Sequence, residues 1–189
     1  MDWENVKKAT RQRIVDVFWK INEEKLFSDI SVKEICFAAK ISRSTFYEYF
    51  KSVNELLETE ENRILSEVGA NPRIQTFNPE EFKGDTIKDS FIEIYRRNQC
   101  CFDALFSQYG DPRFMVQYKN VLKEGLIKNI RKAGYDHENL DLIIEYEISG
   151  MIGMVQRWFQ TGRQQPFGEI VKLYGNLSLH GPVSFIITK

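Results

Sequence analysis

The stretch from Ser31 to Leu57, SVKEICFAAKISRSTFYEYFKSVNELL, constrains the fold more than any other part of this chain, because it contains three helix starts in close succession. Ser31 is followed three residues later by Glu34, and Ser52 by Glu55. Both pairs fit the capping box, in which the Ser side chain accepts from a backbone N–H and the Glu reaches back. Ser42 lies between them and predicts a third start. Two short helices joined by a tight turn, the second polar on its outer side, form a helix-turn-helix.

Hydrophobic spacing predicts helices in the rest of the chain as well. Apolar residues recur every three or four positions from Thr10 to Lys25, from Ser52 to Gly69 and in several segments after residue 85. Residues 70–84 predict a loop, since they contain two Asn-Pro pairs and a Gly. Residues 183–187 are β-prone but too isolated to predict a strand. We therefore expect an all-α protein of about nine helices.

Composition fits a globular protein that can bury a core, with hydrophobic residues at 42% and charged residues at 28%. No apolar run approaches the roughly 18 residues that cross a bilayer, and the N-terminal residues lack the apolar segment of a secretory signal. The three cysteines, of which Cys100 and Cys101 are adjacent, make a poor disulfide framework and indicate a reducing compartment. We expect a cytoplasmic protein with no membrane partner.

The patterns that carry catalysis or metal binding do not occur in this sequence. The two histidines, His137 and His180, are far apart, and neither has a second His or Cys at ligand spacing. There is no Walker loop, dinucleotide-binding glycine pattern or nucleophile elbow. Acidic runs such as Glu58 to Glu61 are interpreted as solvated helix faces. We expect no metal, no cofactor and no enzymatic activity.

The helix that Ser42 opens has two sides suited to different tasks. Ile41, Phe46 and Phe50 are expected to face inward, which leaves small hydroxyls and a cation on the outer side. Arg43 can donate two hydrogen bonds to a guanine, and Thr45 offers a methyl and a hydroxyl to base edges. Free N–H groups at helix N-termini can bind phosphate. The expected DNA contacts are Ser31, Lys33, Ser42, Arg43, Ser44, Thr45, Tyr47, Tyr49 and Lys51.

The overall charge of the chain gives little indication of nucleic-acid binding. The net charge is −1, although residues 1–13 and residues 31–52 each have a local excess of basic side chains. We therefore expect specific DNA binding that is sensitive to salt and non-specific binding that is weak.

The segment ISRSTFYEYFKSVNELL resembles the signature of the TetR family of transcriptional regulators, in which a Ser-capped helix carries an aromatic-Tyr pair and a Tyr/His-Phe pair before an acid-Leu helix start. The preceding ISVKEICFAAK fits the family's second helix, so the resemblance covers about Thr10 to Leu57. Lys40 stands where the family often has Gly, and Val53 where it typically has a phosphate-contacting Lys. The resemblance implies a DNA-binding head, residues 1–52, and an effector-binding and dimerisation body, residues 53–189.

The last two predicted helices carry more apolar surface than one protomer needs. Gly150 and Gly153 lie in the interior of the helix from Asp141 to Thr161, where each costs about 1 kcal/mol relative to Ala. Close packing against a neighbour would explain them, and so would ordinary core packing. The resemblance implies that these helices pair with their copies in a two-fold dimer. The expected dimer residues are Gly150, Gly153, Val155, Phe159, Ile170, Leu173, Tyr174 and Leu177.

Aromatic and sulfur-containing side chains gather in the middle helices. In the family this region encloses an effector cavity, whereas for any single side chain core packing is the simpler interpretation. As a group they fit an apolar pocket with a few polar groups, so the expected effector is a mainly apolar or aromatic small molecule. The expected pocket residues are Tyr95, Phe102, Phe106, Met115, Tyr118, Met151, Met154 and Trp158.

The leading hypothesis is that the chain is an effector-responsive, DNA-binding transcriptional regulator. More specifically, we expect a repressor that binds a palindromic operator as a homodimer. One alternative is a ligand-binding or protein-interaction module of the same fold whose head no longer reads DNA, which Val53 and the net charge favour. A third is an all-α enzyme, which no catalytic constellation supports.

Overall fold

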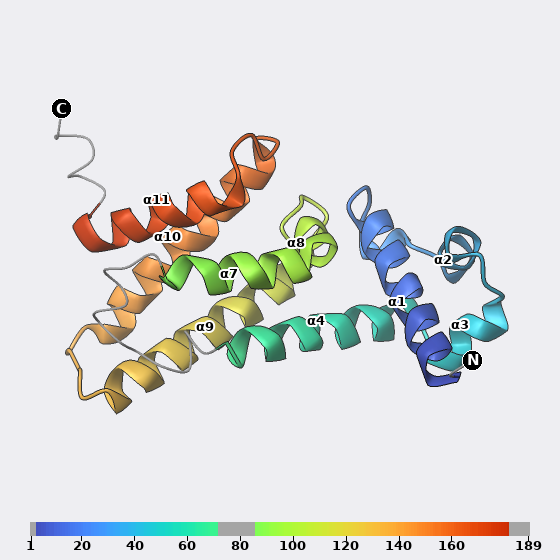
Figure 1. Ribbon diagram of the computed structural model, residues 1–189, viewed down its shortest axis with the longest axis horizontal. Coiled ribbons are helices and arrows are strands. Elements are labelled where there is room, and N and C mark those ends of the chain that lie inside the picture. The colour runs from blue at the N-terminus through green and yellow to red at the C-terminus, as the bar shows by residue number, and fades with distance from the viewer. Residues whose placement is uncertain (1–2, 72–85, 182–189) are drawn as a thin grey trace. The chain divides into compact units, whose positions relative to one another are not determined.

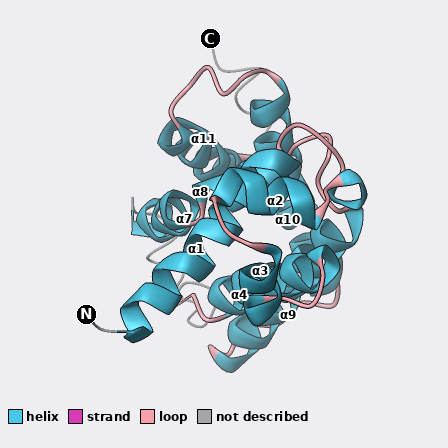
Figure 2. Cartoon of the chain, turned by 90° about the vertical axis from the view of Figure 1, so that its right-hand side faces the viewer, coloured by secondary structure: helices cyan, strands magenta, loops and turns pink. Residues whose placement is uncertain are grey.

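The computed structural model describes residues 3–71 and 86–181, which form helices joined by loops and turns, with no strand in these two ranges (Figures 1 and 2). The predicted all-α class is confirmed, and the number of helices in the described ranges is close to the predicted nine. The predicted loop from residue 72 onward and the β-prone residues 183–187 lie outside the described residues. Among the described helices, none has the length and apolar character that a membrane span requires.

The elements follow one another as a series of helices of very different lengths. In chain order they are α1 (Trp3–Asn22), the 3-10 helix η1 (Phe27–Asp29), α2 (Val32–Ala39), α3 (Arg43–Tyr49), α4 (Val53–Gly69), α7 (Thr86–Arg97), α8 (Gln99–Leu105), α9 (Pro112–Lys132), α10 (Leu140–Gln160) and α11 (Phe167–His180). They divide into two compact units. The first comprises residues 1–64 and 99–114, and the second residues 65–98 and 115–189. The functional boundary at residue 52 stays a prediction.

The first unit is built on α1, which packs against α2 and against α8, a helix from much later in the chain. Phe18 and Trp19 of α1 are fully buried, as are Ile35 of α2 and Phe46 of α3. Burying a side chain of this kind stabilises a fold by roughly 1.5–3 kcal/mol. The helix-turn-helix is therefore one side of a core that α1 and α8 complete.

Helix capping fixes the start of α2 and of α3 as the sequence predicts. The Ser31 hydroxyl accepts from the Glu34 N–H at 3.3 Å, and the Glu34 carboxylate accepts from the Ser31 N–H at 2.9 Å, so this capping box is complete. The Ser42 hydroxyl accepts from the Thr45 N–H at 3.0 Å. Each such cap contributes about 1 kcal/mol.

The second predicted capping box, at the start of α4, is only half correct. The Ser52 hydroxyl accepts from the Glu55 N–H at 3.1 Å, as expected. The Glu55 carboxylate, however, accepts from the N–H of Lys51 rather than from that of Ser52. The Glu55 side chain therefore accepts from the residue before the cap and not from the cap itself.

The turn between α2 and α3 requires a left-handed backbone at Lys40, with φ 54° and ψ 50°. This is the position where the resembling family often has Gly, and Gly adopts the conformation without steric cost. A residue with a Cβ loses roughly 1–2 kcal/mol there. Lys40 is thus a strained residue at the C-terminal end of α2.

We expect Lys40→Gly to raise the free energy of unfolding by about 1 kcal/mol, because relief of the left-handed strain exceeds the added chain entropy of Gly. Urea denaturation of the whole chain measures it. Lys40→Ala keeps the Cβ and should leave the stability nearly unchanged. Equal gains from both variants would show that the lysine side chain, and not the backbone, is the source of strain.

The second unit packs α11 against both α7 and α10. An aromatic cluster joins these helices: the Tyr95 ring lies 5.8 Å from that of Trp158 and 4.4 Å from that of Phe167. The Trp158 indole donates to the Gln165 carbonyl at 2.8 Å, which fixes the turn between α10 and α11. Lys123 of α9 pairs with Asp141 of α10 at 2.9 Å.

Candidate functional site

Helix α3 is held in one orientation by buried aromatic side chains. Phe46 is 0% exposed, and its ring centroid lies 6.0 Å from that of buried Phe50, while Ile41 is half-buried. Tyr47 packs edge-on against Phe46 yet remains 56% exposed. The inward and outward sides of α3 are therefore those that the sequence predicts.

The first turn of α3 presents an available cation beside a group of hydroxyls. Arg43 is exposed and makes no hydrogen bond or ion pair within the described ranges. The Ser42 hydroxyl lies 2.7 Å from that of Ser44 and 2.8 Å from that of Thr45. Small polar groups allow close approach to a groove, and a free guanidinium can donate two hydrogen bonds to guanine.

The remaining predicted DNA contacts lie around this turn in the same unit. Ser31 and Lys33 are exposed at the start of α2, and Tyr49 is half-buried at the end of α3. The Lys51 side chain is 90% exposed and lies 3.8 Å from Glu55. An exposed pair at that distance contributes little, so the ammonium remains available to a phosphate. These assignments stay predictions.

One exposed side chain of the helix-turn-helix does not follow from the sequence pattern. Phe37 on α2 is 87% exposed, and it lies four residues after Lys33, on the same side of the helix. Phe37 was not among the predicted DNA contacts, although the structure leaves it far more exposed than Phe46.

The predicted effector residues are divided between the two compact units. Phe102 and Phe106 belong to the first, where both are buried with ring centroids 5.8 Å apart. In the second unit the structure brings Tyr95 and Trp158 together. Tyr118 is buried there, and burial raises the pKa of its hydroxyl. The half-buried members are Tyr95, Met115, Met151 and Met154. Their role in an effector site stays a prediction.

The glycines of α10 are not explained by packing against the described residues. Gly150 and Gly153 are exposed, and a Cβ added at either position would meet no atom of another described element within 4 Å. Of the two explanations that the sequence left open, core packing therefore finds no support in residues 3–71 and 86–181. The other predicted dimer residues are exposed Leu173 and half-buried Val155, Phe159, Ile170, Tyr174 and Leu177.

Phe159 and Tyr174 also have partners inside the chain. The Phe159 ring lies 4.9 Å from that of Trp158 and has the Arg163 guanidinium over it at 5.4 Å. The Tyr174 hydroxyl donates to Glu147 at 3.1 Å, and burial raises its pKa. Two further apolar side chains of α10 are exposed and were not among the predicted dimer residues. They are Leu142 and Tyr146, which are 66% and 61% exposed and lie eight and four residues before Gly150.

The interpretation of Glu58 to Glu61 as a solvated face is wrong for two of these side chains. Glu60 is buried and accepts from Arg11 at 2.7 Å and from Arg63 at 2.8 Å. Glu61 is only 7% exposed, and within residues 3–71 and 86–181 its Oε1 has no hydrogen-bond partner. The sequence could not show this, because two of the charged side chains that act on Glu61, those of Asp111 and Arg113, come from a distant segment.

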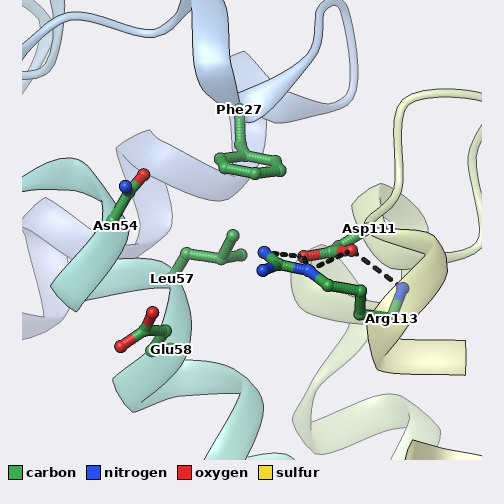
Figure 3. A pocket seen from close by; sticks show the side chains of 6 residues that line it. All are labelled: Phe27, Asn54, Leu57, Glu58, Asp111 and Arg113. Carbon is green, nitrogen blue, oxygen red and sulfur yellow. Dashed lines mark hydrogen bonds and ion pairs between the residues drawn. The ribbon is translucent and has the colours of Figure 1, made fainter. Parts of the chain in front are cut away.

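That segment also forms one side of a pocket of about 320 Å³, which we call the α4–α9 pocket. Figure 3 shows the Phe27 ring on one side, α4 opposite it, and Arg113 reaching in from the start of α9. All of its lining residues belong to the first unit: Phe27, Asn54, Leu57, Glu58, Asp111 and Arg113. None of these residues was among the predicted site residues.

The charges of this pocket are arranged unevenly. Arg113 donates from Nε and Nη2 to both carboxylate oxygens of Asp111, the shortest contact being 2.7 Å. Burial opposes the charged form of Asp111, but these hydrogen bonds outweigh it and hold its pKa below the ordinary value. Burial and the nearby Asp111 carboxylate raise the pKa of Glu61 to about 7.

Comparison with known proteins agrees with this architecture. Residues 85–179, half of the chain, match the family model of the C-terminal region of transcriptional regulators of the TetR type. The HTH-type dhaKLM operon transcriptional activator DhaS of Lactococcus lactis subsp. lactis (strain IL1403) is 24% identical over 178 residues, which span 89% of this chain and 91% of that protein.

Two solved structures share the fold over nearly their whole length. The TetR transcriptional regulator from Streptococcus agalactiae 2603V is 19% identical with a TM-score of 0.61, over 93% of this chain and 96% of that one. The transcriptional regulator FadR from Bacillus subtilis, solved in complex with stearoyl-CoA, is 14% identical with a TM-score of 0.65, over 90% and 98%. The family and these relatives are transcriptional regulators and not enzymes. The chain belongs to the TetR family of transcriptional regulators.

Proposed function

We propose that the chain is an effector-responsive repressor that binds a palindromic operator as a homodimer. The observation that carries the proposal is the first turn of α3, where an exposed Arg43 and three hydroxyls stand on a helix anchored by buried Phe46. A rigid helix with a polar outer side of this kind fits the major groove. In a two-fold dimer, two copies of α3 would read successive half-sites.

Control by a small molecule is the second part of the proposal. The aromatic cluster of the second unit and the predicted effector residues around it suit an apolar or aromatic ligand. We propose that the protein is cytoplasmic and meets this ligand there. A ligand that binds one dimer conformation better than the other would select a head spacing that no longer matches the operator. No membrane partner and no cofactor enter this proposal.

A footprint of the full chain on the intergenic DNA next to its own gene tests DNA binding. At low salt we expect protection of a palindromic site, with affinity that falls steeply as salt rises, because phosphate contacts release counterions. If no protected site occurs in any neighbouring intergenic region, the head does not read DNA. The chain would then be the ligand-binding or protein-interaction module that Val53 and the net charge of −1 favour.

The glycines of α10 allow a sharp test of the dimer. Gly150→Leu with Gly153→Leu should convert the dimer into a monomer, because bulky side chains would hold the partner away, while the protomer has open space for them. Sedimentation velocity measures the oligomeric state and circular dichroism the helix content. A side chain added at Gly175 of α11 would also lie in open space. Gly175→Leu therefore tests whether the interface extends over α11.

The expected result is monomers of unchanged helix content. A double variant that stays dimeric would place the interface elsewhere. In that case each Gly→Ala change in α10 should simply stabilise the helix, by about 1 kcal/mol.

Activation is a second candidate for the direction of control, and one observation favours it: the lactococcal relative, at 24% identity, is named an operon activator. In vitro transcription from a promoter that carries the footprinted site distinguishes the two. Repression predicts fewer transcripts when the chain is added and recovery with effector. More transcripts on addition of the chain would establish activation.

A further inference from the structure

We propose that the α4–α9 pocket binds a small aromatic cation, and that binding releases a proton from Glu61. This site lies wholly in the first unit, and none of its lining residues belongs to the predicted effector set. The proposal is independent of the proposed function, because neither the ligand nor the readout involves DNA.

The walls of the pocket suit a flat apolar body. The Phe27 ring faces the cavity from η1, and Leu57 lies across from it on α4 (Figure 3). A volume of about 320 Å³ is near the lower end of small-molecule sites, which run from roughly 300 to 1,000 Å³. A single aromatic ring with a short polar substituent fits that size and can stack on Phe27.

The polar groups of the pocket select for positive charge. Glu58 is exposed to the cavity and forms no ion pair within the described ranges. The cation that lines the pocket, Arg113, is already bound to Asp111 through two of its nitrogens. The lining residues include two carboxylates, those of Glu58 and Asp111, and one guanidinium, that of Arg113. A planar cation can donate to Glu58 while the Arg113–Asp111 pair stays intact.

Glu61 is the group whose protonation would be coupled to ligand binding. It lies on α4 four residues after Leu57 and three after Glu58, so it shares their side of the helix. Its Oε1 has no hydrogen-bond partner among the residues that the structure describes, and the side chain is nine-tenths buried. The charged groups that influence the pKa of Glu61 are Asp111 and Arg113 at the start of α9 and Glu58 on its own helix.

Burial, and next the Asp111 carboxylate, keep the pKa of Glu61 near 7, well above its ordinary 4.5. A cation in the pocket would favour the ionised form. In the ligand-bound state a smaller fraction of Glu61 would therefore be protonated near neutral pH. The released proton goes to the buffer. No bond to the ligand forms or breaks.

Titration calorimetry of the full chain with benzamidine tests the proposal, with benzamide and benzoate as neutral and anionic probes of the same shape. We expect benzamidine to bind and the other two to bind at least tenfold more weakly. Repeating the titration in buffers of different ionisation enthalpy counts the released proton. Affinity for benzamidine should rise with pH up to about 7 and then level off.

Variants locate the effect. Glu58→Gln should weaken benzamidine binding at least fivefold, whereas Glu24→Gln, an exposed glutamate of the same unit that loses the same charge, should not. Glu61→Gln should abolish both the proton release and the pH dependence. Absence of benzamidine binding, preference for benzoate, unchanged affinity in Glu58→Gln, or proton release that persists in Glu61→Gln would each overturn the proposal.

Discussion

Replacing Arg43 and Tyr47 together by Ala is expected to reduce the affinity for the operator by about 100-fold or more, while the protein remains folded. A bidentate arginine contact to guanine is worth about 1–3 kcal/mol, and a dimer loses it twice. Both side chains are exposed, so their removal leaves no cavity in the core. Gel-shift titration on the footprinted fragment at one fixed salt concentration measures the loss.

The matched control removes the same two residue types from the second unit. Arg96 and Tyr135 are both exposed, and Arg96→Ala with Tyr135→Ala changes the net charge by the same amount. We expect its affinity to stay within a few-fold of the parent, as for the loss of a distant charge. If both double variants weaken binding equally, the chain attracts DNA through overall charge and α3 reads nothing.

Phe46→Ala should cost about 3–5 kcal/mol of the free energy of unfolding, the range for emptying a buried aromatic site. Phe46 is 0% exposed and is the side chain on which α3 is anchored against the first unit. This is a large share of the stability of an ordinary domain. Specific DNA binding should disappear with it, because α3 loses its fixed orientation. Urea denaturation followed by circular dichroism measures the change.

Phe37→Ala is the stability control, since it deletes the same phenyl group from a side chain that is 87% exposed in the same unit. Its free energy of unfolding should change by no more than about 0.5 kcal/mol. If the two variants destabilise the chain equally, Phe37 is covered in solution, and the exposed side of α2 is an interface rather than a free surface.

The features that the sequence predicted well depend on neighbours along the chain. The caps at Ser31 and Ser42 follow from spacings of three residues, and the inward positions of Phe46 and Phe50 follow from one helical turn. The left-handed backbone at Lys40 occurs where the resembling family often has Gly. In each case the conformation is decided by residues close together in the sequence, and no distant contact opposes it.

The features that were missed depend on contacts across long sequence separations. Helix α8 joins the first unit by packing on α1, and Glu61 of α4 is buried within electrostatic reach of Asp111 and Arg113 from a distant segment. No helical period shows that an acidic run will be covered in this way. The α4–α9 pocket was invisible for the same reason, since its walls come from three separate segments.

Guanine methylation protection on the operator tests the central claim, that the outer side of α3 reads base pairs in the major groove. Methylation at N7 occurs in that groove, where Arg43 would donate. We expect protected guanines in two half-sites one helical turn apart, and loss of one protected guanine per half-site in Arg43→Ala. Guanines that remain fully reactive under saturating protein, or protection that Arg43→Ala leaves unchanged, would contradict the account.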